Sequence, residues 1–115
     1  MSQSDCLFCR IAAGDIPADM VASDEHFVAF HDLHPLAPVH VVVMPRQHVQ
    51  SLEHVDDLAE PVRDAMLSFI AATARALEVA HSGYRVVTNT GPDPGQKVMH
   101  LHWHIIGGEP LGGMA

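Results

Sequence analysis

Near its C-terminal end, the chain alternates histidine with large apolar residues over positions 100–106. The histidines are His100, His102 and His104, and the apolar residues are Leu101, Trp103, Ile105 and Ile106. Strict alternation predicts a half-buried β-strand, because successive side chains of a strand point to opposite faces of the sheet. The apolar face can pack on a core, so the three imidazoles share the other face and meet water, a metal or an anionic ligand there. The alternative is three incidental surface histidines, although a surface strand has no structural need for such a row.

The acidic composition narrows the classes of partner. The 115 residues include 14 Asp and Glu against 6 Lys and Arg, which gives a net charge of −8 with neutral histidine. Nucleic-acid backbones are bound through clustered Lys and Arg, so we expect no nucleic-acid partner. A single small phosphate compound is compatible with this charge, because backbone N–H groups and imidazoles can hold a phosphate.

The sequence also predicts a soluble, cytoplasmic protein. No apolar run approaches the ~20 residues that span a bilayer, so no membrane partner is expected. The first residues, Met1 to Asp5, lack a basic start followed by an apolar stretch, so no signal peptide is expected. In the reducing cytoplasm, Cys6 and Cys9 are expected to be thiols or metal ligands rather than a disulfide.

Apolar periodicity and turn residues predict two helices and five strands. The short helix is expected to start after Asp5 as its N-cap and to stop at Gly14. The long helix is expected to be capped by Asp56 or Asp57, to hold Pro61 in its first turn and to end near residues 81–83. Strands are expected over residues 20–23, 26–32, 40–44, 84–89 and 100–106. Two connections between strands are too short for parallel crossovers, which favours an α+β fold with an antiparallel sheet.

Spacing along the histidine strand favours His102 as a reaction centre. Positions two apart on a strand are ~7 Å apart, so neighbouring imidazoles can share a phosphate, or two can bind one metal ion. A neutral imidazole is a competent nucleophile towards phosphorus, and its pKa near ~6.5 keeps it mostly unprotonated at pH 7. Gly95 and Gln96 lie just before the strand, where backbone N–H groups could approach an anion because glycine has no Cβ.

Taken together, these motifs resemble the histidine triad (HIT) family of nucleotide hydrolases and transferases. The resemblance rests on H-x-H-x-H followed by two apolar residues, and it extends through residues 6–11, 30–32, 37–40, 42–45, 89–91 and 95–96. The ending over residues 107–112 is similar to the Hint branch, the purine nucleoside phosphoramidases. The resemblance implies a single HIT domain over residues 1–115 with about five antiparallel strands, one long helix and one short helix. It also implies a homodimer whose sheets join across the interface.

The resemblance further implies roles for individual residues. His102 matches the nucleophile, which forms a nucleotidyl-histidine intermediate that water hydrolyses. His104 matches the residue near the phosphate and leaving group, while His100 and His40 match supporting histidines. Asp32 matches the carboxylate that holds the ribose hydroxyls, although an aspartate before a loop can equally cap a turn. The nucleotide-binding residues implied beside Asp32 are Phe8, Ile11, Phe30, His31, Leu33, Asn89, Gly95, Gln96, Lys97 and Val98. Animal members have serine at the position of Lys97, which could contact the leaving group or reach into solvent.

Two cysteines and two histidines predict a zinc site. Cys6 and Cys9 form a Cys-x-x-Cys pair, and His48 and His100 could complete a tetrahedral Cys₂His₂ set. Some bacterial members of the resembled family carry zinc on such a set, and this chain matches it at all four positions. The zinc would be structural, because four protein ligands leave no open position for water. The alternative is a pair of idle thiols near the N-terminus.

The resemblance to the Hint branch implies an enzyme that cleaves the P–N bond of purine nucleoside 5′-phosphoramidates, such as adenosine 5′-monophosphoramidate, with an AMP- or GMP-type product. The chemistry itself is expected to need no cofactor. Three alternatives stay open: a dinucleoside polyphosphate hydrolase of the same fold, a nucleotide-binding regulatory protein, and a zinc hydrolase that uses the triad as ligands.

Overall fold

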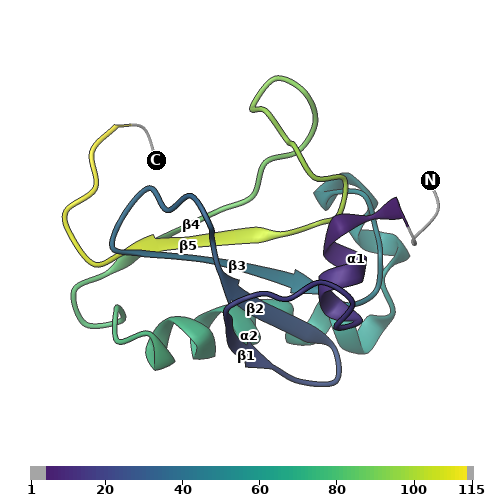
Figure 1. Cartoon of the computed structure of the whole chain (residues 1–115), viewed down its shortest axis with the longest axis horizontal. Coiled ribbons are helices and arrows are strands. Elements are labelled where there is room, and N and C mark those ends of the chain that lie inside the picture. The colour runs from purple at the N-terminus through teal and green to yellow at the C-terminus, as the bar shows by residue number, and fades with distance from the viewer. Residues whose placement is uncertain (1–4, 114–115) are drawn as a thin grey trace.

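A five-stranded antiparallel sheet with the strand order β1-β2-β3-β5-β4 forms the centre of the protein (Figure 1). The computed structural model describes residues 5–113. The strands are β1 (Met20–Ser23), β2 (Phe27–His31), β3 (Val39–Pro45), β4 (Tyr84–Val87) and β5 (Trp103–Gly107). The helices are α1 (Leu7–Ala12), a 3₁₀ helix η2 (Leu52–Asp57) and α2 (Glu60–Ala76). The predicted α+β class and the antiparallel sheet with one long and one short α-helix are confirmed.

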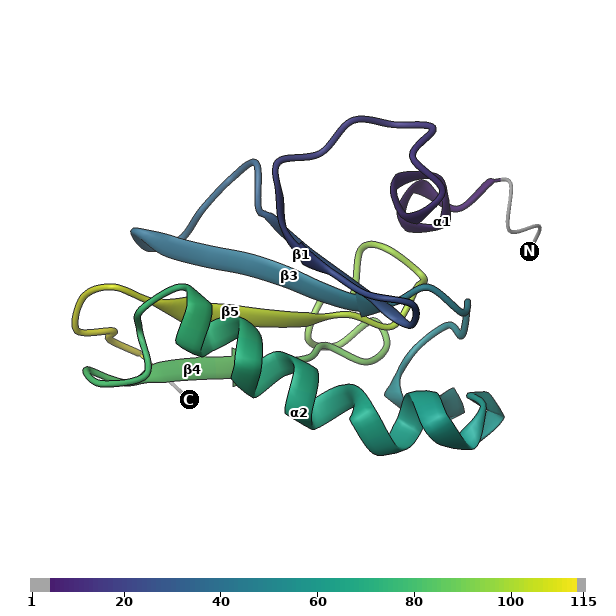
Figure 2. The same cartoon turned by 90° about the horizontal axis from the view of Figure 1, so that it is seen from below.

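The two faces of the sheet are covered by different helices. Figure 2 shows α2 along one face and α1 over the other. Strand β2 explains this division, because Phe27 and Ala29 belong to the α2-side core, whereas Val28 and Phe30 belong to the cluster under α1. Alternation of apolar residues on both faces is what a strand covered on both sides requires.

The histidine segment has the predicted alternation, although its regular strand begins later than expected. Leu101, Trp103 and Ile105 pack with the α2-side core, so the three imidazoles face the α1 side. Strand β5 starts only at Trp103, since the N–H of Leu101 donates to the carbonyl of Val49, in the loop after β3, instead of to a ladder partner. Strand β3 pairs with β5 so that His40 lies opposite Ile106. This register brings a fourth histidine to the row.

The expected cap of the short helix is wrong. The N-cap of α1 is Cys6 rather than Asp5, and its Sγ accepts a hydrogen bond from the N–H of Cys9 at 3.4 Å. The thiol takes the part that a carboxylate usually plays at this position. Gly14 follows the helix with φ +82° and confirms the predicted stop.

The bounds of the long helix also differ from expectation. Neither Asp56 nor Asp57 caps α2, because both lie in η2, and Ala59 is the N-cap without a side-chain hydrogen bond. Pro61 lies in the first turn as predicted. The helix ends at Ala76, before residues 81–83, because the chain turns there to bury Val79 in the core. No helix in residues 5–113 is long and apolar enough to cross a membrane.

Candidate active site and metal centre

His102 is held in one tautomer by the backbone of a neighbouring residue. Its Nδ1 lies 2.7 Å from the carbonyl oxygen of His100. A carbonyl oxygen only accepts hydrogen bonds, so Nδ1 carries the proton of the neutral ring and Nε2 keeps its lone pair. The side chain is buried, and the ring edge of Phe8 packs against it with centroids 4.9 Å apart. His102 therefore presents an unprotonated nitrogen from a fixed ring.

His40 and His104 form a second, hydrogen-bonded pair. The N–H of Leu36 donates to Nδ1 of His40 at 3.0 Å, so the proton of neutral His40 sits on Nε2. That Nε2 lies 2.9 Å from Nδ1 of His104 and 3.5 Å from a carboxylate oxygen of Asp32. Nδ1 of His104 is thus an acceptor, and His104 carries its own proton on Nε2. The ring of His104, with its Nε2–H donor, is a neighbour of the His102 ring, and the two ring centroids are 5.2 Å apart.

Burial favours the neutral forms of His102 and His104. It lowers the pKa of His102, against the raising effects of the His100 carbonyl and of the Asp32 charge. Burial also lowers the pKa of His104 to about 4, with a further lowering by His102 and His40 and an opposing effect of Asp32. Both rings are therefore uncharged at neutral pH, the state that nucleophilic attack requires.

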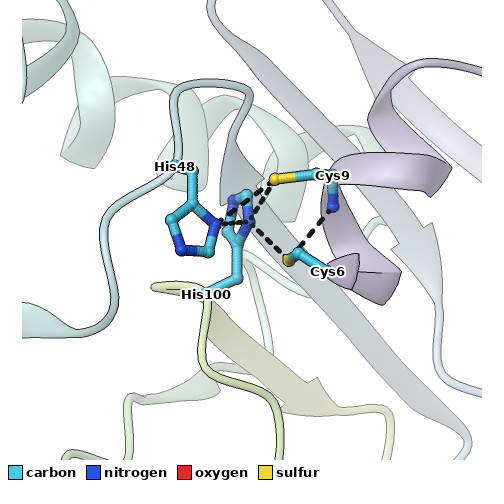
Figure 3. A group of neighbouring side chains, drawn as sticks. All are labelled: Cys6, Cys9, His48 and His100. Atoms are coloured by element: carbon cyan, nitrogen blue, oxygen red, sulfur yellow. Dashed lines mark hydrogen bonds between the residues drawn. The ribbon is translucent and has the colours of Figure 1, made fainter. Parts of the chain in front are cut away.

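The predicted metal ligands converge on one point between α1 and the loop after β3 (Figure 3). Nδ1 of His100 lies 3.4 Å from Sγ of Cys6 and 3.4 Å from Sγ of Cys9. Nδ1 of His48 lies 3.3 Å from Sγ of Cys9 and 3.3 Å from Nδ1 of His100. Around zinc, with bonds of about 2.3 Å to sulfur and 2.0 Å to nitrogen, tetrahedral donors lie about 3.3–3.8 Å apart. The four donor atoms fit such a site.

The protonation of His100 suits a metal, whereas the buried Cys9 thiol would have to lose its proton when a metal binds. His100 Nε2 donates to the carbonyl oxygen of Pro45 at 2.7 Å, which leaves the Nδ1 lone pair directed at the sulfur atoms. In the metal-free cluster, burial, the hydrogen bond to Cys6 and the charge of Cys6 raise the pKa of Cys9 to about 12. Burial lowers the pKa of His100 to about 4, with further lowering by His48 and His102 against the Pro45 carbonyl. Two soft sulfur donors and two neutral imidazoles are a set that zinc prefers.

Comparison with known proteins identifies the family. The HIT domain profile matches residues 13–111. The chain belongs to the HIT family. This HIT protein is 39% identical to Protein HitA of Neisseria gonorrhoeae over 90% of its own length and 95% of that protein. It is 34% identical to the purine nucleoside phosphoramidase of Escherichia coli K12 over 96% of its length and 92% of the relative.

Solved structures support the same assignment. A histidine triad protein from Clostridium difficile matches the whole HIT chain with a TM-score of 0.91 at 38% identity, and all of that chain is covered. A HIT family hydrolase from Clostridium thermocellum matches 98% of each chain with a TM-score of 0.84 at 34% identity. The fold and the family that the sequence motifs predicted are confirmed by these matches.

Several residues expected at the nucleotide base gather on the α1 side of the HIT sheet. Phe8 and Phe30 pack edge to face at 5.6 Å, and Ile11 and Val98 join the same apolar cluster. Leu33 is 87% exposed, and His31 is also exposed. Asp32 accepts the N–H of His34 at 2.8 Å with one carboxylate oxygen, so the turn-capping role is present. Its other oxygen is the one that approaches His40.

The loop before the histidine segment holds itself together through the residues expected at the phosphate. The N–H groups of Gly95 and Gln96 donate to loop carbonyls at 3.0 Å. The Gln96 side chain accepts from Gly91 and donates to the carbonyls of Gln50 and Val98. In this conformation these donors serve the loop rather than point freely at an anion. Asn89 is half-buried and Lys97 is exposed.

Most of the contacts that sequence reasoning missed are made by backbone atoms. The N–H of Leu36 and the carbonyls of Pro45 and His100 set the histidine tautomers, and no side-chain pattern marks them. Thr88 was also missed, and its hydroxyl donates to the carbonyl of His102 at 2.7 Å. A threonine at the end of a β-rich run gave no signal that separates this contact from ordinary strand propensity.

Proposed function

We propose that this HIT protein is a nucleotide hydrolase that cleaves purine nucleoside 5′-phosphoramidates through a covalent intermediate on His102. The observation that carries the proposal is that neighbouring rings on one face of the sheet have complementary tautomers, with a lone pair on Nε2 of His102 and a proton on Nε2 of His104. The name of the Escherichia coli relative, a purine nucleoside phosphoramidase, supports the substrate class.

The first step forms a bond between Nε2 of His102 and the α-phosphorus. The bond between phosphorus and the amine nitrogen breaks, and the amine leaves with one proton from solvent water. The Nε2–H of His104 donates to the phosphate oxygens or the leaving nitrogen, which stabilises the charge that develops in the transition state. The Nδ1–H of His102 keeps its hydrogen bond to the His100 carbonyl. This hydrogen bond stabilises the imidazolium that forms when Nε2 is bonded to phosphorus.

The second step returns the enzyme to its starting state. Water attacks phosphorus, the P–N bond to His102 breaks, and the nucleoside monophosphate leaves with release of one proton. The apolar cluster with Phe8, Ile11, Phe30 and Val98 supplies the surface for the purine, and Asp32 with Asn89 supplies acceptors for the ribose. Gln96 and Lys97 are placed near the phosphate and the leaving group.

The activity is tested by release of AMP from adenosine 5′-monophosphoramidate, followed by chromatography. The wild type and His81→Asn, a change at an exposed histidine, are expected to turn over equally, and His102→Asn is expected to be inactive. Turnover of diadenosine polyphosphates with no turnover of the phosphoramidate would favour the polyphosphate hydrolase. Tight AMP binding with no turnover of either would favour the regulatory binding protein.

The proposal includes a structural zinc held by Cys6, Cys9, His48 and His100. When bound, the ion joins α1 to the loop after β3 and to the histidine segment as a cross-link. Elemental analysis of the purified chain is expected to give about one zinc per chain, and Cys9→Ser is expected to lose it. A folded but inactive protein after chelation, with full stability, would instead favour the zinc hydrolase.

The proposal also includes a homodimer that extends the sheet at β4. This strand lies at the sheet edge, where its outer backbone groups can pair with a second copy. Tyr84 and Val86 are each 37% exposed on it, and Leu67 of α2 is 65% exposed. Light scattering is expected to give twice the chain mass for the wild type and the single mass for Val86→Lys. A wild-type monomer would contradict this part.

A further inference from the structure

His100 is the residue at which the Cys–His cluster meets the catalytic histidines. Its ring is fully buried. Nε2 donates to the Pro45 carbonyl at 2.7 Å, and Nδ1 lies 3.4 Å from both sulfur atoms. Both ring nitrogens are therefore engaged, and a flip of the ring would leave two buried polar atoms without partners.

The backbone of His100 passes this constraint to His102. The thiols contact the ring of His100, and the carbonyl oxygen of the same residue accepts a hydrogen bond from the Nδ1–H of His102 at 2.7 Å. This bond selects the tautomer that leaves Nε2 unprotonated. Movement of the His100 backbone would break the hydrogen bond from Nδ1–H of His102. The ring could then adopt the opposite tautomer, which has no lone pair on Nε2.

A second path to His102 runs through α1. This helix has six residues, too few to persist without tertiary contacts. Cys6 and Cys9 attach it to the two histidines of the cluster, as Figure 3 shows. Phe8 lies between the two cysteines, and its ring meets the His102 ring at 82° with centroids 4.9 Å apart. The thiols thus also hold an aromatic wall against the nucleophile.

We propose that Cys6, Cys9 and His48 are positioning residues for His102, which they act on through His100 and Phe8. In the metal-free cluster a thiol S–H can donate to Nδ1 of His100, and zinc would engage the same lone pair. The role therefore belongs to the chain's own donor set in both states. The inference rests on the proposed function only in taking His102 as the nucleophile.

The test compares Cys9→Ser and His48→Asn with the wild type and with Ile70→Val as a control. Ile70 lies in α2 on the opposite face of the sheet, so its change lowers stability without touching the cluster. The first readout is the ¹⁵N NMR spectrum of the His102 ring, which distinguishes the two neutral tautomers. The second is the separation of kcat from KM for adenosine 5′-monophosphoramidate.

The wild type and Ile70→Val are expected to show His102 in the Nδ1–H tautomer alone. The two cluster variants are expected to show a mixture of tautomers, with kcat lowered about tenfold or more and KM within about twofold. Should Cys9→Ser fail to fold, His48→Asn gives the same comparison, because the His48 ring is only part-buried.

The proposal is overturned if the cluster variants keep the His102 tautomer and the kcat of the Ile70→Val control while only their melting temperature falls. The cluster would then be purely structural. A wild type that turns over no phosphoramidate would count against the proposed function alone, since the NMR comparison does not depend on turnover.

Discussion

The two ends of the histidine row are held by different means. At one end, His100 and His102 are buried, and their polar contacts are to sulfur atoms and backbone carbonyls of the interior. At the other end, His104 is half-buried and bonded to His40, whose second nitrogen depends on the N–H of Leu36 in an exposed loop. In the proposed mechanism, the attacking nitrogen thus comes from the end with His100 and His102, and the donor to the leaving group comes from the end nearer solvent.

The largest expected difference between the two ends is in turnover. In the proposed mechanism, His102→Asn removes the atom that bonds to phosphorus, so kcat is expected to fall by at least about 10⁴-fold. His104→Asn removes one donor to developing charge, for which about 10²- to 10³-fold is typical. Single-turnover kinetics on both variants measure this. Equal losses would show that the two histidines act as one unit and would break the comparison.

Metal removal is expected to affect only the end of the row that holds His100 and His102, through the stability of the fold. If zinc is present at a hundred times its dissociation constant, removing it lowers the free energy of unfolding by about 2.7 kcal/mol. For a domain of this size, the melting temperature falls by roughly 10 °C. Thermal melts with and without chelator measure the effect, and Cys9→Ser is expected to show none. A wild type indifferent to chelator, with no bound metal, would contradict the zinc assignment.

Loss of His40 tests the end of the histidine row at His104. His40→Ala leaves the Leu36 N–H and Nδ1 of His104 without their partners, which costs about 1–3 kcal/mol of unfolding free energy. Urea denaturation measures this cost. Chelator is expected to destabilise the His40→Ala variant as much as it destabilises the wild type, because His40 lies at the end of the row away from the Cys–His cluster. A chelator response that disappears in this variant would join the two ends into one unit.

The smallest effect is expected in the pH dependence of stability. The His104 pKa is lowered from 6.5 to about 4 in the folded state by burial and by His102 and His40. Between these values the unfolded chain binds more protons, so stability falls as the pH drops from 6.5 towards 4, and this contribution is then fully lost. His104→Asn is expected to show a shallower fall in melting temperature from pH 7 to pH 5 than His81→Asn. Identical slopes would contradict the lowered pKa.

The sequence predicted which residues share a face of the sheet better than it predicted where the helices begin and end. A period of two placed Leu101, Trp103 and Ile105 in the core and the histidines opposite them, because burial enforces that pattern along the whole segment. The caps of both α-helices were missed, since a thiol at Cys6 replaced the expected carboxylate and η2 occupied the expected start of α2. Local propensity carries little information where tertiary contacts decide.

The same distinction applies to the site. The triad histidines and the four zinc donors could be named from their pattern and chemistry, and the four donors do meet, whereas His40 was named only through the family resemblance. The groups that choose the tautomers are backbone atoms of Leu36, Pro45 and His100, which every residue possesses. Only coordinates reveal where such atoms point. The engaged state of the Gln96 side chain was equally invisible in the sequence, because it depends on carbonyls of residues that lie apart along the chain.

The most direct measurement is the intact-protein mass after a short, quenched incubation with adenosine 5′-monophosphoramidate. The account predicts a transient gain of one AMP that peptide mapping assigns to His102 and that is absent in His102→Asn. Release of AMP with no adduct at any time, or an adduct on another residue, would contradict covalent transfer through His102.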